Sequence, residues 1–377
     1  DVDPVYYQDE FGCETAHLTF TGDQTTDYLT VVQIKEILLD RQAQLREEIE
    51  NQFPQARMLG VDVQTWAKGF SVKAAEKVQK LQTRFNKLDK AIQPLKIFFN
   101  THETPEELSS RWLVSKVEDQ NILKLAPLYG DFLFKEYFGT LADKFVFLSA
   151  TLGTKKEFAK ELGIAPSKML FIETGSPFPP EKSPIIAMPA ISLAKKEYEN
   201  NVEQIGPLID VILDNHPDQR GIIHSVTYDL QKRIFNGVSQ VNRDRLLCRD
   251  MDVLGKGSRR KYGNTELLEL HEKETNSVLL SPSMMEGVDL HDDLSAFQVI
   301  IKLPWANLGD LRIRTKSRLD EDWYQNRMWV NVLQASGRST RHEHDSAVTY
   351  ILDKTFNRCY RQWKHRIPSW FKDRLIE

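Results

Sequence analysis

The spacing of apolar residues changes about a third of the way along the 377-residue chain. Before residue 140, apolar residues recur every three or four positions, which is the period of an amphipathic helix. This spacing predicts two long helices, over about residues 31–52 and 71–93. Residues 1–29 are punctuated by Asp-Pro, Phe-Gly and Thr-Gly-Asp, and they predict turns with one short strand.

The next segment combines a helix start with two short strands. Residues 104–107 read Thr-Pro-Glu-Glu, which is typical of an N-cap followed by proline at the first helical position. Apolar runs at 112–117 and 122–125, joined by Glu-Asp-Gln-Asn, predict a β-hairpin. A helix over about residues 130–138 is expected to follow.

Beyond residue 141 the pattern consists of short, continuous apolar runs, as expected for strands that are buried on both faces. Helical patterns separate these runs, most clearly at residues 201–215 and 323–336. Strand–helix alternation of this kind predicts a parallel α/β sheet. The predicted strands lie at residues 144–148, 184–188, 221–225, 277–280, 297–301 and 347–351.

The net charge and the cysteine content limit the functional classes to which this chain can belong. The formal net charge is −4, which excludes a globally basic nucleic-acid coat and leaves room only for a local basic patch. Cys13, Cys248 and Cys359 form no CxxC pair, so this chain alone cannot build a zinc ribbon or an iron–sulfur cluster. Their wide spacing favours a reducing compartment, either cytoplasmic (nucleoid-associated) or nuclear, and we expect no secretion and no membrane span.

A basic stripe follows one side of the second predicted long helix. The cations lie one residue before the apolar positions, so the basic stripe flanks the apolar one. Two interpretations stay open: a solvated face, or a ridge that faces the phosphates of a nucleic acid. The stripe consists of Lys73, Lys77, Lys80, Arg84 and Lys87.

Three polar clusters lie where ligands of α/β sheets gather, near strand ends. The first is Ser149-Ala150-Thr151, and the second spans residues 285–289. The third spans residues 334–341, on the helix expected before the last strand.

The third cluster carries the most chemical information. Arg338 and Arg341 are three residues apart, so on a helix they point to one side, which Gln334 shares. Two guanidiniums and an amide aimed together suit a polyanion that changes charge during reaction, such as a γ-phosphate. The alternative is a helix end whose surface arginines pair with Glu343 or Asp345.

These segments resemble a known family. FVFLSATLG, SPSMMEGVDL and QASGRSTR, in that order, resemble motifs III, V and VI of superfamily two helicases, in the XPD/DinG branch. Residues 122–127 resemble the return from that branch's arch domain, and residues 221–228 resemble motif IV. The resemblance covers about residues 112–353.

The resemblance implies a fold and a domain plan. We expect a RecA-like (P-loop NTPase-like) parallel sheet flanked by helices, with a helical arch-like region at the N-terminus. Residues 1–140 would form the arch-like region and return segment, and residues 141–185 the final strand of the first RecA-like domain and a linker. Residues 186–377 would form the second RecA-like domain.

The resemblance also implies roles for individual residues. Arg338 and Arg341 would be arginine fingers, and Gln334 would contact the γ-phosphate or the attacking water. Glu286, Gly287, Asp289 and Gly337 would lie beside the nucleotide. The predicted links between the motor domains are Ser149, Ala150 and Thr151, and the predicted nucleic-acid contacts are Ser225, Tyr228, Lys73, Lys77, Lys80 and Arg84.

One departure from the family pattern is decisive. The chain has no Walker A sequence and no DEAH sequence, which are the elements that hold ATP and Mg²⁺. We therefore expect the C-terminal part of a larger ATP-dependent DNA helicase with 5′-to-3′ polarity, inactive alone. A missing N-terminal lobe would bind most of the ATP and Mg²⁺ and would carry the family's iron–sulfur cysteines.

Partners and alternatives follow from the same resemblance. The expected partners are single-stranded or forked DNA and the missing lobe. Two alternatives stay open: a non-catalytic half-motor that binds nucleic acid, and an ATPase completed in trans by a separate chain. His342-Glu-His344 has a spacing that metals use, but we expect a solvated loop there and no metal site.

Overall fold

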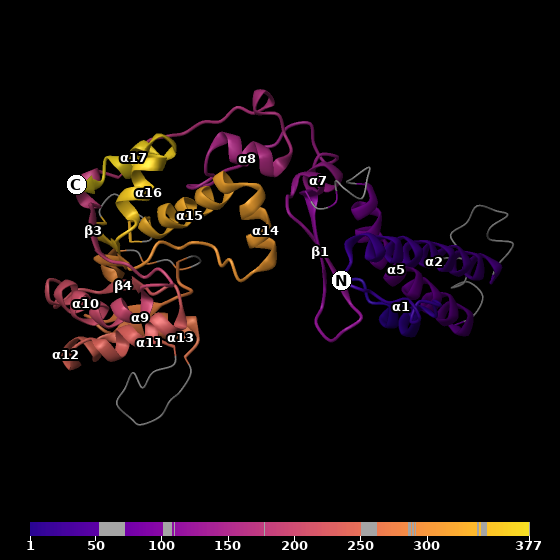
Figure 1. The fold of residues 1–377 in the computed structure, drawn as a ribbon, viewed down its shortest axis with the longest axis horizontal. Coiled ribbons are helices and arrows are strands. Elements are labelled where there is room, and N and C mark those ends of the chain that lie inside the picture. Colours follow the sequence, from indigo (N-terminus) through magenta and orange to yellow (C-terminus); the bar gives the residue numbers. More distant parts are fainter. Residues whose placement is uncertain are drawn as a thin grey trace. The chain divides into compact units, whose positions relative to one another are not determined.

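The computed structural model divides the chain into two compact units (Figure 1). The first contains residues 1–144, 160–164 and 309–319, and the second contains the remaining residues from 145 to 377. The domain boundaries expected from the family stay a prediction. The structure describes residues 1–52, 72–100, 108, 110–176, 178–249, 262–285, 288, 290, 292–337, 339–340 and 345–376.

The first unit begins with a helix that the sequence pattern did not predict. α1 (Pro4–Phe11) is capped by the Asp3 carboxylate, which accepts hydrogen bonds from the backbone N–H groups of Val5 (3.0 Å) and Tyr6 (3.1 Å). Gly12 ends the helix at a φ of +70°, a conformation that favours glycine. The prediction of turns for residues 1–29 was therefore wrong, because Asp-Pro here is an N-cap followed by proline at N1.

The two predicted long helices are present and longer than expected. α2 (Gln24–Asn51) begins at the Asp23 N-cap, and α5 (Val72–Asn100) passes through Pro94 instead of ending before it. Proline removes one helical hydrogen bond. Burial of Leu95 and Phe98 beyond it offsets this cost, because both side chains are in the core that α2 and α5 share.

The predicted hairpin and the helix after it are confirmed. β1 (Trp112–Lys116) pairs antiparallel with β2 (Leu123–Pro127), and α7 (Asp131–Leu133) continues into a π-helical turn over Phe134–Phe138. The N-cap predicted at residues 104–107 lies outside the described residues. α14 (Leu311–Leu319), from much later in the chain, also belongs to this unit.

The second unit is built on a seven-stranded sheet in the order β5-β6-β4-β7-β8-β3-β9. Every neighbouring pair is parallel, which confirms the predicted α/β class with a parallel sheet flanked by helices. The strands are β3 (Ile185–Ile191), β4 (Gly221–His224), β5 (Leu246–Leu247), β6 (Val278–Ser281), β7 (Phe297–Ile300), β8 (Val348–Asp353) and β9 (Leu375–Ile376).

Alternate residues of each central strand face opposite sides of the sheet. In β4, Ile223 packs with α10 (Ile205–Asp214) and α11 (Tyr228–Gly237), whereas Ile222 packs with α13 (Asn264–Lys273). In β7, Ile300 packs with the helices that cover the other half of that second face. Those helices are α15 (Glu321–Ser336), α16 (Phe356–Trp363) and α17 (Ser369–Lys372). The remaining helices are α8 (Lys155–Leu162), α9 (Tyr198–Asn201) and α12 (Gln240–Arg243).

One predicted strand is wrong. Residues 144–148 have no regular secondary structure and belong to no strand of the described sheets. Val146 is 83% exposed and Leu148 is 90% exposed, so the apolar run is not buried on either face. An apolar pattern predicts a strand only where neighbouring strands and covering helices are present, and this segment has neither in the described structure.

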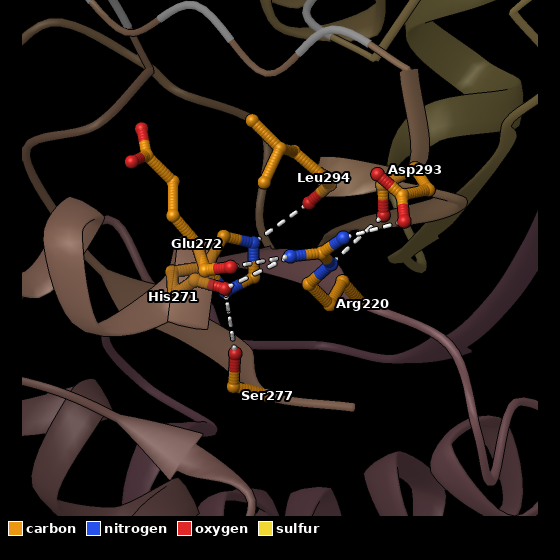
Figure 2. Close-up of polar contacts among 6 residues, drawn as sticks. All are labelled: Arg220, His271, Glu272, Ser277, Asp293 and Leu294. Atoms are coloured by element: carbon orange, nitrogen blue, oxygen red, sulfur yellow. Dashed lines mark hydrogen bonds and ion pairs between the residues drawn. The ribbon is translucent and has the colours of Figure 1, made fainter. Parts of the chain in front are cut away.

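A buried polar cluster fixes the beginning of the central strands (Figure 2). Nε2 of His271 donates to the carbonyl of Leu294 (2.7 Å), so its Nδ1 accepts from the hydroxyl of Ser277 (2.8 Å). Arg220, just before β4, donates to the carbonyls of His271 and Glu272 at the end of α13. These bonds tie α13 to the starts of β4 and β6 and to the turn before β7.

This cluster makes the stability of the second unit depend on pH. Burial, with a smaller contribution from Arg220, lowers the pKa of His271 from 6.5 to about 4. In the unfolded chain, His271 therefore takes up a proton near pH 6.5. In the folded chain, it stays neutral until the pH falls to about 4. We expect the free energy of unfolding to fall by about 3 kcal/mol as the pH is lowered from 6.5 to about 4. Urea unfolding at a series of pH values measures this change. His271→Gln should flatten this dependence, whereas the exposed His365→Gln should leave it intact; an unchanged slope in His271→Gln contradicts the assignment.

A glycine pair sets the approach of α10 and α11. A Cβ added at Gly206 would lie 2.1 Å from the carbonyl oxygen of Gly237, whereas a Cβ at Gly237 would meet nothing closer than 3.4 Å. A methyl group at position 206 would therefore clash with the neighbouring helix, whereas one at position 237 would fit.

Gly206→Ala should destabilise the second unit by about 1–3 kcal/mol, because the helices must separate to admit the methyl group. Gly237→Ala is the matched control and should change the free energy of unfolding by less than about 1 kcal/mol. Chemical denaturation of both variants checks this, and equal effects would show that the backbone contact is not the cause.

Candidate nucleotide and nucleic-acid site

The sheet topology marks one crevice as a place for a ligand. The chain leaves β4 toward β5 on one edge and leaves β7 toward β8 on the other, although β4 and β7 are neighbours. Ligands of open α/β sheets bind where adjacent strands diverge in this way, at their carboxyl ends. At this point the chain places Ser225, directly after His224 of β4.

The loop after β4 has a defined geometry. Ser225 is fully buried, its N–H donates to the carbonyl of Ser281 (3.1 Å), and its carbonyl accepts from Thr227 (2.7 Å). Its Oγ is buried with no hydrogen-bond partner among the described residues. Val226 has a φ of +64°, which is rare for a β-branched residue, and Thr227 caps α11. The structure thus places Ser225 and Tyr228 together at the carboxyl end of β4.

Tyr228 starts α11 with 47% of its surface exposed. Its hydroxyl accepts a hydrogen bond from a guanidinium N–H of Arg249 (3.1 Å), and the Arg249 guanidinium also lies 6.0 Å from the Tyr228 ring. Arg249 was not predicted as a site residue, because its place beside Tyr228 depends on the fold of β5. The Tyr228 ring and the Arg249 guanidinium therefore lie together at the same edge of the sheet.

The cluster after β6 is described only in part. Ser281 ends β6 beside β4, and its hydroxyl lies 3.3 Å from that of Ser283. Buried Met284, Val288 and Leu290 anchor the segment to the sheet. Glu286, Gly287 and Asp289, the predicted nucleotide neighbours, lie outside the described residues.

Gln334 lies in the last turn of α15. This helix begins at Asp320, whose carboxylate accepts from the N–H of Trp323 (2.9 Å), and it buries a face that includes Val332 and Leu333. The Oε1 atom of Gln334 is buried with no hydrogen-bond partner among the described residues.

The end of α15 lies directly before the predicted arginine pair. α15 ends at Ser336 with Gly337 as its C-cap, and the described residues Ser339 and Thr340 are not helical. The helical face that Gln334, Arg338 and Arg341 are expected to share stays a prediction. Arg338 and Arg341 lie outside the described residues, so their role stays a prediction.

A pocket of about 440 Å³ brings two of the three predicted clusters together. Ser149, Ala150 and Thr151 line it from one side, and Gln334 and Gly337 line it from α15. Its other described lining residues are Thr340, which belongs to the third cluster, and seven residues that are not among the predicted site residues: Thr174, Gly175, Ser176, Phe178, Leu333, Trp370 and Arg374.

Arg374 is the most informative of the missed residues. It is 6% exposed, its Nε donates to the carbonyl of Ser183 (2.6 Å), and one Nη donates to that of Ser336 (3.1 Å). Its guanidinium carbon also lies 5.7 Å from the Trp370 ring. Burial lowers the pKa of this guanidinium to about 10. Arg374 comes directly before β9, a two-residue strand that is too short for a pattern to reveal.

The predicted basic stripe lies on α5 of the first unit. Lys73, Lys77 and Lys80 are exposed. Arg84 instead donates to the carbonyl of Glu10 (3.1 Å), and the neighbouring Lys87 pairs with the Glu10 carboxylate (2.6 Å). The half of the stripe nearer the C-terminus therefore holds α1 against α5, which is a structural role.

No metal centre is found in the described part of the chain. It contains no group of three or more His, Cys, Asp or Glu side chains that could hold an ion, and His342-Glu-His344 lies outside it. Among the same residues, no helix has the length and apolar character needed to cross a membrane.

Known proteins resemble parts of this chain. The model of the helicase C-terminal domain family matches residues 212–374. The ATP-dependent DNA helicase CHL1 of Saccharomyces cerevisiae (strain YJM789) is 26% identical over 115 residues, and that of Coccidioides immitis (strain RS) is 27% identical over 150 residues. The matches cover 26% and 32% of this chain, but only 13% and 17% of these relatives.

Solved structures show a weaker likeness. S. tokodaii Xpd4 covers 79% of this chain and 59% of its own length, with 16% identity and a TM-score of 0.45. An XPD helicase structure covers 81% of this chain and 54% of its own length, with 16% identity and a TM-score of 0.47. Because both TM-scores are below 0.5, the fold assignment rests on the observed sheet.

Proposed function

We propose that this chain is the second motor lobe and arch-like region of an ATP-dependent DNA helicase of the XPD/DinG-like branch of superfamily two. The match of residues 212–374 to the helicase C-terminal domain family and the similarity to curated DNA helicases support this proposal. The observation that carries the proposal is the family match over the segment that forms most of the parallel sheet. The whole enzyme would couple ATP hydrolysis to 5′-to-3′ movement along single-stranded DNA and to unwinding of forked DNA. Such movement suits a role in DNA repair.

The pocket beside α15 fits the neighbourhood of a polyphosphate. Buried Gln334 Oε1 and Thr151 Oγ1 have no hydrogen-bond partner among the described residues, so each is available to a ligand or to an ordered water. No carboxylate is among the described lining residues, so Mg²⁺ would be held mainly by the missing lobe. When bound, Mg²⁺ neutralises charge that develops on the transferring phosphoryl group.

The missing lobe would also complete two exposed strand-like segments. In the second unit, Val146 and Leu148 are followed after about 20 residues by Leu170 and Ile172, which are 86% and 71% exposed. Both segments lack regular secondary structure and join no strand of the described sheets. Apolar strands of this type are expected to pair within a sheet, and the first RecA-like lobe is the partner that the family resemblance supplies.

Within this scheme each group has one task. Gln334 orients the γ-phosphate or the attacking water, and Arg338 and Arg341 stabilise charge on the transferring group. Ser149 and Thr151 transmit closure of the two lobes. Ser225 donates its hydroxyl to a strand phosphate, a contact that positions the strand without reading its sequence.

Removing the Ser225 hydroxyl should weaken binding of single-stranded DNA. Ser225→Ala should raise the Kd for a fluorescent oligo(dT) by about 10- to 100-fold, since a hydrogen bond to a charged phosphate contributes about 1.5–3 kcal/mol. Fluorescence anisotropy at fixed salt measures this, because phosphate contacts depend on salt.

Ser183→Ala is the matched control. Its hydroxyl is also fully buried and has no partner among the described residues, but it lies just before β3, at the amino end of the sheet. It should leave the Kd unchanged. Equal affinities of the Ser225→Ala variant and the unmodified chain would remove Ser225 from the strand-binding surface.

Catalysis should require a second lobe. The purified 377-residue chain should hydrolyse ATP negligibly, because the Walker A lysine and the magnesium carboxylate are absent from it. Adding the first lobe of an XPD/DinG-like helicase should restore DNA-stimulated turnover, measured by phosphate release.

Arg338→Ala should then reduce the restored turnover by about 10³-fold or more, as expected for an arginine finger. Arg318→Ala, which removes an exposed arginine of α14, should leave it unchanged. Turnover by the chain alone contradicts the half-motor proposal, and restored turnover that survives Arg338→Ala contradicts the role given to that arginine.

A further inference from the structure

Arg374 is a buried cation with only neutral partners. Its two described hydrogen bonds go to backbone carbonyls, those of Ser183 and Ser336. No carboxylate of the described residues pairs with it. A buried charge without a counter-charge is costly, so a protein that keeps one usually gains something from it.

The guanidinium has donors to spare, and they face a pocket. Arginine carries five N–H groups, and the described bonds use two of them. Arg374 lines the same pocket of about 440 Å³ as Gln334. It is the only charged side chain among the described lining residues, so the pocket attracts anions.

The pocket walls add polar groups that lack partners. Thr151 Oγ1 and Thr340 Oγ1 are buried without a hydrogen bond among the described residues, and hydroxyls can donate to phosphate oxygens. Ser149, Thr174 and Ser176 supply further hydroxyls around the same space. The combination of one guanidinium and several hydroxyls, without a carboxylate, matches the chemistry of phosphate recognition.

We propose that Arg374 binds the phosphate chain of a nucleoside polyphosphate in this pocket, together with the hydroxyl of Thr340. The proposal deepens the function above by naming a phosphate contact outside the QASGRSTR motif. The volume suits a small-molecule ligand of several groups better than a single phosphate. The strand-binding candidates Ser225 and Tyr228 do not line this pocket, which favours a nucleotide over a DNA phosphate.

Arg245 provides a matched comparison within the same unit. It is 8% exposed, and its guanidinium also donates to backbone carbonyls, those of Leu213, His216, Gln219 and Asn276. The pockets beside it are lined by Asp244 and other acidic residues, so they do not attract anions. Arg245 therefore binds backbone carbonyls as Arg374 does, but it is not expected to bind a phosphate.

The test titrates inorganic tripolyphosphate into the purified 377-residue chain. Isothermal titration calorimetry gives the Kd, and tryptophan fluorescence gives a second readout through Trp370, which the Arg374 guanidinium contacts. Arg374→Met should raise the Kd by about 10- to 100-fold, the loss expected for a charge-assisted hydrogen bond. Arg245→Met should destabilise the fold and leave the Kd unchanged.

Thr340→Val keeps the proposal testable if Arg374→Met does not fold. It preserves shape, removes one hydroxyl, and should raise the Kd by about 10- to 100-fold, because a hydrogen bond from this hydroxyl to a phosphate oxygen is charge-assisted. An unchanged Kd in folded Arg374→Met, or in Thr340→Val, overturns the proposal. So does a Kd for oligo(dT) that rises in these variants while the Kd for tripolyphosphate does not. Because no turnover is measured, a failure to restore hydrolysis with a first lobe would count against the helicase proposal and not against this site.

Discussion

Burial of the strands on both faces of one parallel sheet is the constraint on which the second unit depends. Ile222 and Ile223 are neighbours in sequence, yet they pack against helices on opposite sides. A shift of one residue in the register of β4 would exchange these faces and move Ser225 out of the crevice between β4 and β7. The His271–Arg220 cluster counteracts such a shift, because it bonds the amino ends of the same strands to α13.

Much of the fold was predictable because its signals are local. Continuous apolar runs identify β4, β6, β7 and β8, and a 3-4 spacing identifies α2 and α5. The failures are also instructive. Residues 144–148 carry a strand pattern but lack a neighbouring strand, and α1 was missed because Asp3-Pro4 is a turn signal and a helix start at once. In both places the deciding information is the structural context, which a pattern in one segment does not contain.

The candidate site also contains residues that could be predicted from the sequence and residues that could not. Gln334 and Ser149–Thr151 were found because their motifs are contiguous in sequence, and the fold does bring them to one pocket. Arg374 was not predicted, because it lies alone between two short elements. Only the folded chain shows that its guanidinium donates to the carbonyl of Ser336 in α15. The helical face predicted for Arg338 and Arg341 stays a prediction, because both residues lie outside those that the structure describes.

The left-handed conformation of Val226 has a consequence for recognition. A β-branched residue held there costs about 1–2 kcal/mol relative to glycine, so the surrounding packing must enforce it. The packing around the turn after β4 consequently holds its backbone in one conformation. Under the proposed function, a phosphate bound at this turn would require no prior ordering of the backbone around Val226.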